Sequence, residues 1–286
     1  MSHKGLDGIN EKYKDLKGKN IAAIHIKVAK EFIQSIANDE NIVGAVLLGG
    51  AAKGFADEWS DIDIAIFVKD KRNCKLKDGE RKWKGYDLDL SVVDLSVAKN
   101  WNWTQIQKWT YSEGIILYDP KGIVNKILRE KVRMSKSERK KLIVERIMLL
   151  GWLGISYEPK KWRDYSFFRP PDLWIKRGYP QCAHQLLNYC IDACLDLLFL
   201  CNNEFIPDEK WKFYLSFKLK WLPENYSSLI ERAIKICELN EIEFWERLNA
   251  LQLIFKSIIQ KLESQGIIPK KIYQYLLKHG EYYSTV

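Results

Sequence analysis

The chain has 286 residues, of which 47% are hydrophobic and 13% aromatic, and its formal net charge is +9. The length exceeds that of a usual single domain, so we expect two domains with packed cores. No apolar run approaches the roughly 20 residues that cross a bilayer, and the first residues lack the features of a signal peptide. We therefore expect a cytosolic (cytoplasmic) protein without a membrane span, and the positive charge favours anionic partners such as a nucleoside triphosphate or RNA.

The N-terminal part opens with a predicted helix that leads into a strand and a glycine turn. Apolar residues at helical spacing predict the helix within residues 19–39, and an apolar run predicts a strand over residues 42–48. Gly49 and Gly50 end this strand, and the residues after them can start a short helix. Because glycine lets the backbone approach an anion closely, we expect Gly49, Gly50 and nearby Lys53 to contact the phosphates of a nucleotide.

Two carboxylates share one face of the next predicted strand, residues 61–68. Side chains alternate along a strand, so Asp61 and Asp63 project to one side while the isoleucines between and after them pack on the other. Neighbouring carboxylates repel each other unless a cation lies between them, and their hard oxygen atoms suit Mg²⁺. We therefore predict a magnesium site at Asp61 and Asp63, with Ser60 in the same nucleotide site.

A third acidic residue is expected from a strand over residues 86–93. Asp87 and Asp89 share a face of this strand. We choose Asp89 because it lies deeper in the apolar run, whereas Asp87 follows a glycine turn and is expected to be solvated. Asp87 stays the alternative.

The rest of the chain is predicted to be mainly helical. The first domain continues with helices over 95–111 and 121–134 and a short strand between them. Ser135 and Glu138 form a capping box that begins a long helix over 136–157. Further helices are predicted over 181–202, 208–217, 224–239, 241–265 and 269–279. We therefore predict an α+β chain, in which a mixed β-sheet domain with flanking helices over 1–134 is followed by an all-α helical bundle domain over 135–286.

A polar stripe runs along the predicted helix over 181–202. His184, Asn188, Asp192 and Asp196 recur every four residues in an otherwise apolar sequence. Unpaired buried charge is costly, so we expect this stripe to face a cleft beside the first domain, or alternatively solvent.

The six cysteines show no paired CxxC spacing, which favours reduced thiols packed in a core. A zinc site through Cys182, His184 and Cys190 is the alternative, but its spacing matches no standard site.

In its glycine turn and its aspartates the sequence resembles the nucleotidyltransferase superfamily, which has the DNA polymerase beta-like fold. The family signature is Gly-Ser, a short helix and Asp-x-Asp on the next strand, with a third acid on a later strand. The resemblance implies that Asp61, Asp63 and Asp89 bind two Mg²⁺ ions, and that Asp89 can draw the proton from an attacking hydroxyl. Gly50 stands where the family has serine, so a hydroxyl contact to the terminal phosphates is lost.

The order of the two domains is similar to that of kanamycin-type and lincosamide-type antibiotic adenylyltransferases. This resemblance implies that the helical domain supplies part of the acceptor pocket, with Asp192 or Asp196 as a general base; we select Asp192. The expected activity is Mg²⁺-dependent transfer of AMP, or another nucleoside monophosphate, from ATP or another triphosphate to a hydroxyl of an aminoglycoside-like acceptor. Two alternatives stay open, namely a nucleotide-binding or antitoxin-like protein with little turnover, and a transferase acting on RNA or protein.

Overall fold

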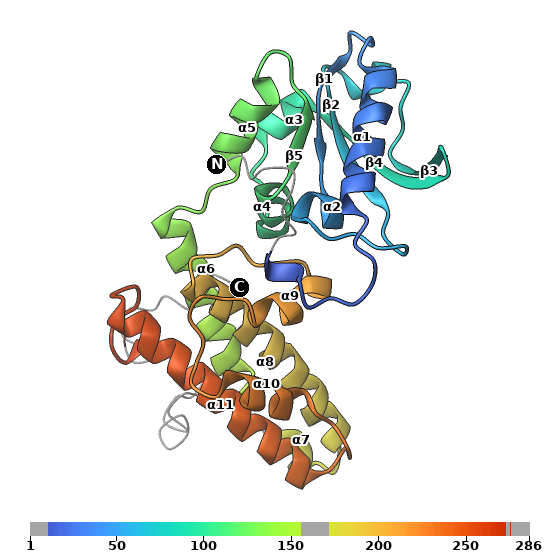
Figure 1. Ribbon diagram of the computed structural model, residues 1–286. Coiled ribbons are helices and arrows are strands. Elements are labelled where there is room, and N and C mark those ends of the chain that lie inside the picture. The colour runs from blue at the N-terminus through green and yellow to red at the C-terminus, as the bar shows by residue number, and fades with distance from the viewer. Residues whose placement is uncertain (1–10, 156–171, 273–274, 276–286) are drawn as a thin grey trace. The chain divides into compact units, whose positions relative to one another are not determined.

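The computed structural model describes residues 11–155, 172–272 and 275, and the chain divides into two compact units, one ending at Arg133 and the other beginning at Met134 (Figure 1). Among the described residues, none of the helices has both the length and the apolar character needed to cross a bilayer.

A five-stranded mixed sheet forms the centre of the first unit. Its strands are β1 (Ile42–Leu47), β2 (Ile62–Val68), β3 (Gly79–Trp83), β4 (Tyr86–Asp94) and β5 (Ile115–Tyr118). Their spatial order is β3-β4-β2-β1-β5, in which β2 and β4 are parallel and the other neighbours are antiparallel. The central strands β1 and β2 are almost entirely buried, because β1 is a continuous apolar run, β2 is apolar apart from Asp63, and helices cover both faces of the sheet. Together with the helical second unit, this sheet confirms the predicted α+β fold class.

Helices cover both faces of this sheet (Figure 1). The helical segments of the first unit are η1 (Glu11–Tyr13), α1 (Ala22–Ile36), α2 (Gly49–Lys53), η2 (Lys71–Asn73), α3 (Leu95–Asn100), α4 (Gln105–Ser112) and α5 (Ile123–Lys131). Helix α1 packs on the face that carries Ile62, Ile64 and Ile66. Helices α3 and α5 pack on the opposite face, against Ala65 and Phe67. Because side chains alternate along β2, this strand contributes residues to two separate hydrophobic cores, one on each face of the sheet.

Two features of the first unit differ from the sequence prediction. The prediction of a single helix over 95–111 is wrong, because α3 ends at Asn100 and α4 begins only at Gln105. Thr104 starts α4 with a capping box, in which the side chains of Thr104 and Gln107 bond each other's backbone amides. Strand β3 was not predicted, because exposed Glu80 and Lys82 give it no apolar pattern of its own.

The second unit is built from helices around α8. Its helices are α6 (Lys136–Trp152), α7 (Leu173–Lys176), α8 (Pro180–Cys201), α9 (Glu209–Ser216), α10 (Tyr226–Ile234) and α11 (Glu241–Ser264). Helix α8 packs against α6, α9, α10 and α11, which explains why all its residues after Asp192 are buried. Helix α10 ends five residues before the predicted limit of 239. Most of the predicted helix over 269–279 lies outside the described residues. The last two residues of the predicted helix over 136–157 also lie outside them.

All six cysteines are free thiols. Four of them are buried, Cys182 is half-buried and Cys237 is exposed. Burial raises the pKa of the Cys190 thiol to about 12, which keeps this thiol protonated at neutral pH.

The first half of the polar stripe on α8 is satisfied inside the bundle by Arg247 of α11. The Arg247 guanidinium is fully buried and donates to His184 Nδ1 at 2.8 Å, to Asn188 Oδ1 at 2.6 Å and to the Ala233 carbonyl at 2.7 Å. His184 Nε2 lies 3.0 Å from the Asn240 carbonyl, which fits the tautomer protonated at Nε2. This network ties α8 and α11 to the end of α10.

The second half of the stripe is bound by two further cations. Lys212 of α9 lies 2.6 Å from Asp192 Oδ1 and 2.8 Å from Asp196 Oδ1, and Arg146 of α6 donates to Asp196 Oδ2 at 2.8 Å. Burial acts to lower the pKa of Lys212, but the two carboxylates outweigh it and the pKa is raised. The stripe therefore holds α6, α8 and α9 together.

Replacing the buried arginine tests this account of the bundle. We expect Arg247→Met to lower the free energy of unfolding by about 3 kcal/mol, because His184, Asn188 and the Ala233 carbonyl lose a buried donor. Urea unfolding of the full chain measures the change. The control is Lys256→Met on the exposed side of the same helix, which we expect to change stability by less than about 0.5 kcal/mol. Equal effects of the two variants would contradict the account.

Candidate functional site

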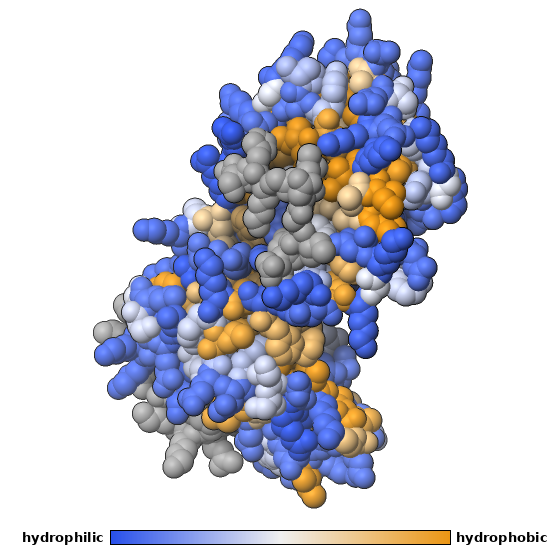
Figure 2. Space-filling model, in the orientation of Figure 1, coloured by the Kyte–Doolittle hydropathy of each residue, from blue (hydrophilic) through white to orange (hydrophobic). Residues whose placement is uncertain are grey.

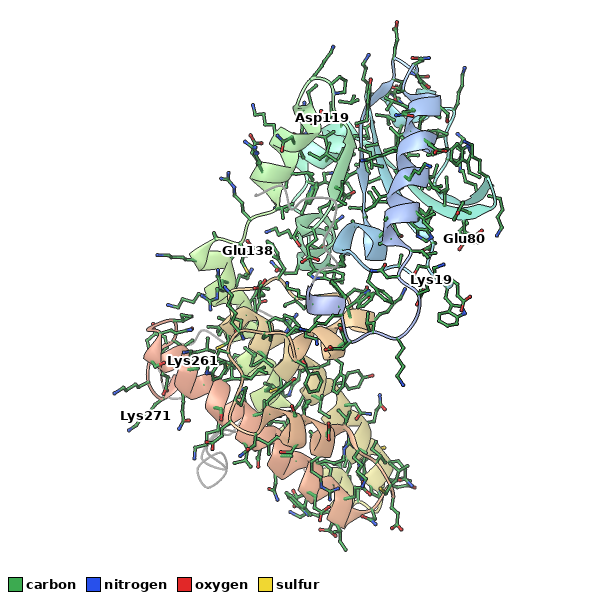
Figure 3. The ribbon with its side chains drawn as sticks, viewed as in Figure 1. Lys19, Glu80, Asp119, Glu138, Lys261 and Lys271 are labelled. Atoms are coloured by element: carbon green, nitrogen blue, oxygen red, sulfur yellow. The ribbon has the colours of Figure 1, made fainter. Side chains whose placement is uncertain are left out.

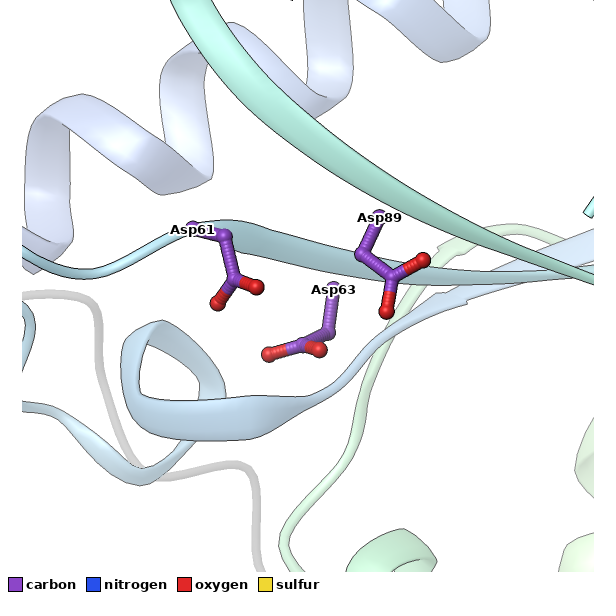
Figure 4. Close-up of side chains that lie close together, drawn as sticks. All are labelled: Asp61, Asp63 and Asp89. Carbon is purple, nitrogen blue, oxygen red and sulfur yellow. The ribbon is translucent and has the colours of Figure 1, made fainter. Parts of the chain in front are cut away.

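Three aspartates from two strands converge on one face of the sheet. Asp61 directly precedes β2, Asp63 lies on β2, and Asp89 lies on β4. Each offers a carboxylate oxygen, and these three oxygens lie within 4.8 Å of one another (Figure 4). The structure thus brings together the three residues that the sequence analysis selected as metal ligands.

The parallel pairing of β2 and β4 explains this convergence. Asp63 and Asp89 are direct partners in the register of the two strands, so their side chains lie at the same height on the same face. Asp61 lies two residues before Asp63 and therefore projects to that face as well. The residues next to them, Ile62 and Leu88, are fully buried on the other face. The apolar core therefore holds the backbone that carries the aspartates.

The surroundings of the aspartates fit a cation. Asp61 is exposed, and Asp63 and Asp89 are half-buried. Within the described part of the chain, the carboxylates of Asp61 and Asp89 form no ion pair and no side-chain hydrogen bond. Carboxylates this close repel one another, and a set of hard oxygen donors suits Mg²⁺. The donor set is thus of the kind that a magnesium site requires.

Asp87 has a different environment from Asp89. Its carboxylate accepts from Lys82 Nζ on the neighbouring strand β3, at 2.7 Å, and it is exposed. The alternation along β4 places Asp87 nearer the start of the strand, beside the β3–β4 turn. Asp89 joins the aspartate cluster and Asp87 is not a member of it.

Gly49 gives Asp63 the space that its carboxylate occupies. Gly49 has a φ of +64°, in the left-handed region that favours glycine, and an added Cβ would overlap the Asp63 carboxylate. The amide of Leu48 donates to the Asp63 carbonyl at 2.9 Å, which fixes the end of β1 beside the aspartate. A residue with a side chain at position 49 would displace Asp63 from this position.

Gly50 is also restricted by its neighbours. A Cβ at this position would lie 2.5 Å from the carbonyl oxygen of Phe55, whose amide in turn donates to the Gly50 carbonyl at 3.0 Å. This tight turn leaves no room for the serine that the resemblance would place here. Glycine at position 50 is therefore matched to the local backbone.

Ser60 and Lys53 have local partners. The Ser60 hydroxyl donates to Asp57 Oδ1 at 2.8 Å and accepts from the Asp57 amide at 3.0 Å. Lys53 is buried, and its ammonium lies 3.8 Å from the centre of the Trp109 ring on α4. Ser60 thus shapes the loop that leads to Asp61, and Lys53 joins α2 to α4. Their predicted contacts with a nucleotide stay predictions.

Two residues near the aspartates were missed by the sequence analysis. His25 on α1 is buried, burial lowers its pKa, and the negative charges of Asp61 and Asp57 act in the opposite direction. Glu80 on β3 is exposed and pairs directly with Asp89 in the register of β3 and β4 (Figure 3). Neither could be found from sequence, since one requires the packing of α1 and the other the register of an unpredicted strand.

Asp192 belongs to the second unit. It lies on α8, its side chain is 49% exposed, and Lys212 holds its carboxylate in an ion pair. Asp196 is almost fully buried between Lys212 and Arg146. Of the two acids considered as a general base, Asp192 is the one with access to solvent.

Comparison with known proteins identifies the first unit. Residues 30–122 match the family model Polbeta, described as "Polymerase beta, Nucleotidyltransferase". No curated protein was found to match the chain. Among solved structures, the chain is similar to a nucleotidyltransferase-like protein from Exiguobacterium sibiricum, with 12% identity, a TM-score of 0.45 and coverage of 88% of this chain and 80% of the other. The family match thus shows a nucleotidyltransferase domain over residues 30–122 of the chain.

Proposed function

We propose that the protein transfers a nucleoside monophosphate, AMP from ATP, to a hydroxyl of a small-molecule acceptor of the aminoglycoside-like type, using Mg²⁺. The cluster of Asp61, Asp63 and Asp89 within a nucleotidyltransferase domain carries this proposal. These carboxylates are the residues that would hold the metal ions.

In the proposed reaction an acceptor oxygen attacks the α-phosphorus of the triphosphate. A new phosphorus–oxygen bond forms, the bond from the α-phosphorus to the bridging oxygen breaks, and pyrophosphate leaves with the electron pair. When bound, Mg²⁺ supplies positive charge that orients the phosphates and stabilises the transition state. Asp89 is proposed to receive the proton of the acceptor hydroxyl, because no side chain in the described ranges pairs with its carboxylate. Gly49 keeps Asp63 in place, as described above.

We propose that the acceptor binds beside acidic side chains. Ammonium groups of an aminoglycoside-like molecule would be attracted to the aspartates of the first unit, where local charge dominates within about 10 Å at physiological salt. Exposed Glu80 extends this acidic face. We retain Asp192 as the proposed acceptor residue of the helical unit because its carboxylate is half exposed.

A second candidate function is nucleotide binding with little turnover. The observation that favours it is Gly50, where the hydroxyl expected from the resemblance is absent and cannot be added without displacing Phe55. Pyrophosphate release separates the two functions. Release in the presence of Mg²⁺, mixed triphosphates and an acceptor panel supports transfer, whereas nucleotide binding without release across that panel supports the second candidate.

Substitution of single aspartates by asparagine tests the proposed metal site. We expect Asp89→Asn to weaken Mn²⁺ or Mg²⁺ binding at least about tenfold, because a charged ligand becomes a neutral amide. The matched control is Asp87→Asn on the same strand, which removes only the ion pair with Lys82 and should leave metal affinity within about twofold. Titration calorimetry measures metal binding without requiring an acceptor. If Asp87→Asn has the larger effect, the assignment of the third carboxylate is wrong.

A second variant tests the role of the glycine turn. We expect Gly49→Ala to weaken metal binding, again by about tenfold or more, because the added methyl group displaces the Asp63 carboxylate. Gly266→Ala is the control, since Gly266 has nearly the same φ of +67° but open space around an added Cβ. The Gly266→Ala variant should have a lower free energy of unfolding but an unchanged affinity for the metal. Unchanged metal binding in Gly49→Ala would show that Asp63 is not held as described.

A further inference from the structure

Positive charge is concentrated at α5 and the residues beside it. Residues 121–133 contain one acidic residue, Glu130, and five basic residues: Lys121, Lys126, Lys131, Arg129 and Arg133. Hydrophilic residues cover the edge of the first unit where α5 lies (Figure 2). The nine-residue helix is therefore a distinctly basic element of the first unit.

The basic side chains of α5 lie opposite its apolar side. Val124, Ile127 and Leu128 are buried against the sheet. Lys126, Arg129 and Arg133 are exposed. The spacing of three residues places Lys126 and Arg129 on one face of α5, and Arg133 follows two residues after the helix ends. The apolar contacts thus fix the helix while its cations project into solvent.

These three cations line a hollow in the surface. The hollow has a volume of about 350 Å³ and is lined by Gly122, Asn125, Lys126, Arg129, Glu130 and Arg133. Asp119, at the end of β5, accepts from the Asn125 amide at 2.8 Å and so holds the first turn of the helix (Figure 3). The hollow is thus a concave basic surface on a supported helix.

The cations of this hollow have no acidic partner within the described part of the chain. Lys126, Arg129 and Arg133 form no ion pair there, and neither does Glu130. Lys131, by contrast, donates to the Trp101 carbonyl at 3.0 Å. Cations that lack internal partners are available to an external anion.

Helix α5 lies on the same face of the sheet as the aspartates. Along β2, the side chains of Asp63, Ala65 and Phe67 share that face, and α5 packs against the Phe67 end. The four residues from Asp63 to Phe67 span about 13 Å of strand. Ala65 and Phe67 are fully buried beneath the helices, so the exposed cations of α5 lie on the outer surface of this side of the unit.

We propose that the basic surface formed by Lys126 and Arg129 of α5, and by Arg133 just after this helix, binds the phosphodiester backbone of a nucleic acid. Three cations that line one open hollow fit the phosphates of a nucleic-acid backbone, since backbone binding requires charge rather than an enclosed pocket. The three cations contact phosphate groups and read no base. This inference goes beyond the proposed function and does not depend on it.

Fluorescence anisotropy of the full chain with a short labelled single-stranded RNA tests the proposal, and DNA of the same sequence forms a second arm. We expect the Lys126→Ala/Arg129→Ala/Arg133→Ala variant to bind RNA at least about tenfold more weakly at low salt, and the salt slope to fall by about 2. The control variant is Lys19→Ala/Lys27→Ala/Lys30→Ala, which removes three exposed cations on and just before α1, the helix that covers the opposite face of the sheet. It should keep RNA affinity within about threefold.

Each outcome either supports or contradicts the proposal that this basic surface binds nucleic acid. Equal losses on RNA and DNA indicate backbone recognition, and a loss on RNA alone identifies RNA as the ligand; both support the proposal. No binding by the unchanged protein, or equal losses in the α1 control, would overturn it. A loss of binding to anionic lipid vesicles without a loss on RNA would also overturn it. The Asp61→Asn/Asp63→Asn variant should retain RNA affinity, which separates this proposal from the transferase activity.

Discussion

The parallel pairing of β2 with β4 is the constraint on which the site depends. Asp63 and Asp89 are 26 positions apart in the sequence but direct partners in the sheet. Their mutual repulsion is opposed by the burial of the residues on the other face of the same strands, including Ile62 and Leu88. The aspartates thus alternate along their strands with residues of the apolar core, which gives the rigid support that a binding site requires.

The glycine turn after β1 completes this support from the other side. Gly49 leaves the space that the Asp63 carboxylate fills, and Gly50 allows a close approach to the Phe55 carbonyl. The two glycines therefore have steric roles that are defined by named neighbours. This differs from the sequence analysis, which explained them by contact with phosphate, and the two explanations are compatible because both require a backbone without side chains.

The helical unit shows how tertiary packing changes the meaning of a polar pattern. The stripe on α8 was expected to face a cleft or solvent, and Asn188 and Asp192 do reach solvent. His184 and Asp196 are instead buried, and Arg247 binds the first half of the stripe while Lys212 and Arg146 bind the second half. Each cation comes from a different helix of the bundle, so the pairs join elements that are distant in sequence. Buried polar groups in such a network are paired, and loss of one partner leaves the others unsatisfied.

The sequence by itself determined the α+β fold class and the shared face of Asp61, just before β2, and Asp63 on β2, because side-chain alternation and apolar periodicity are local properties. It also indicated Asp89, whose apolar neighbours predict a buried strand. Only the tertiary structure decided that Asp87 pairs with Lys82, that Glu80 lies beside Asp89, and that the polar stripe on α8 is bound by cations. These outcomes depend on strand register and helix packing, which join residues far apart in the chain and therefore leave no local pattern in the sequence.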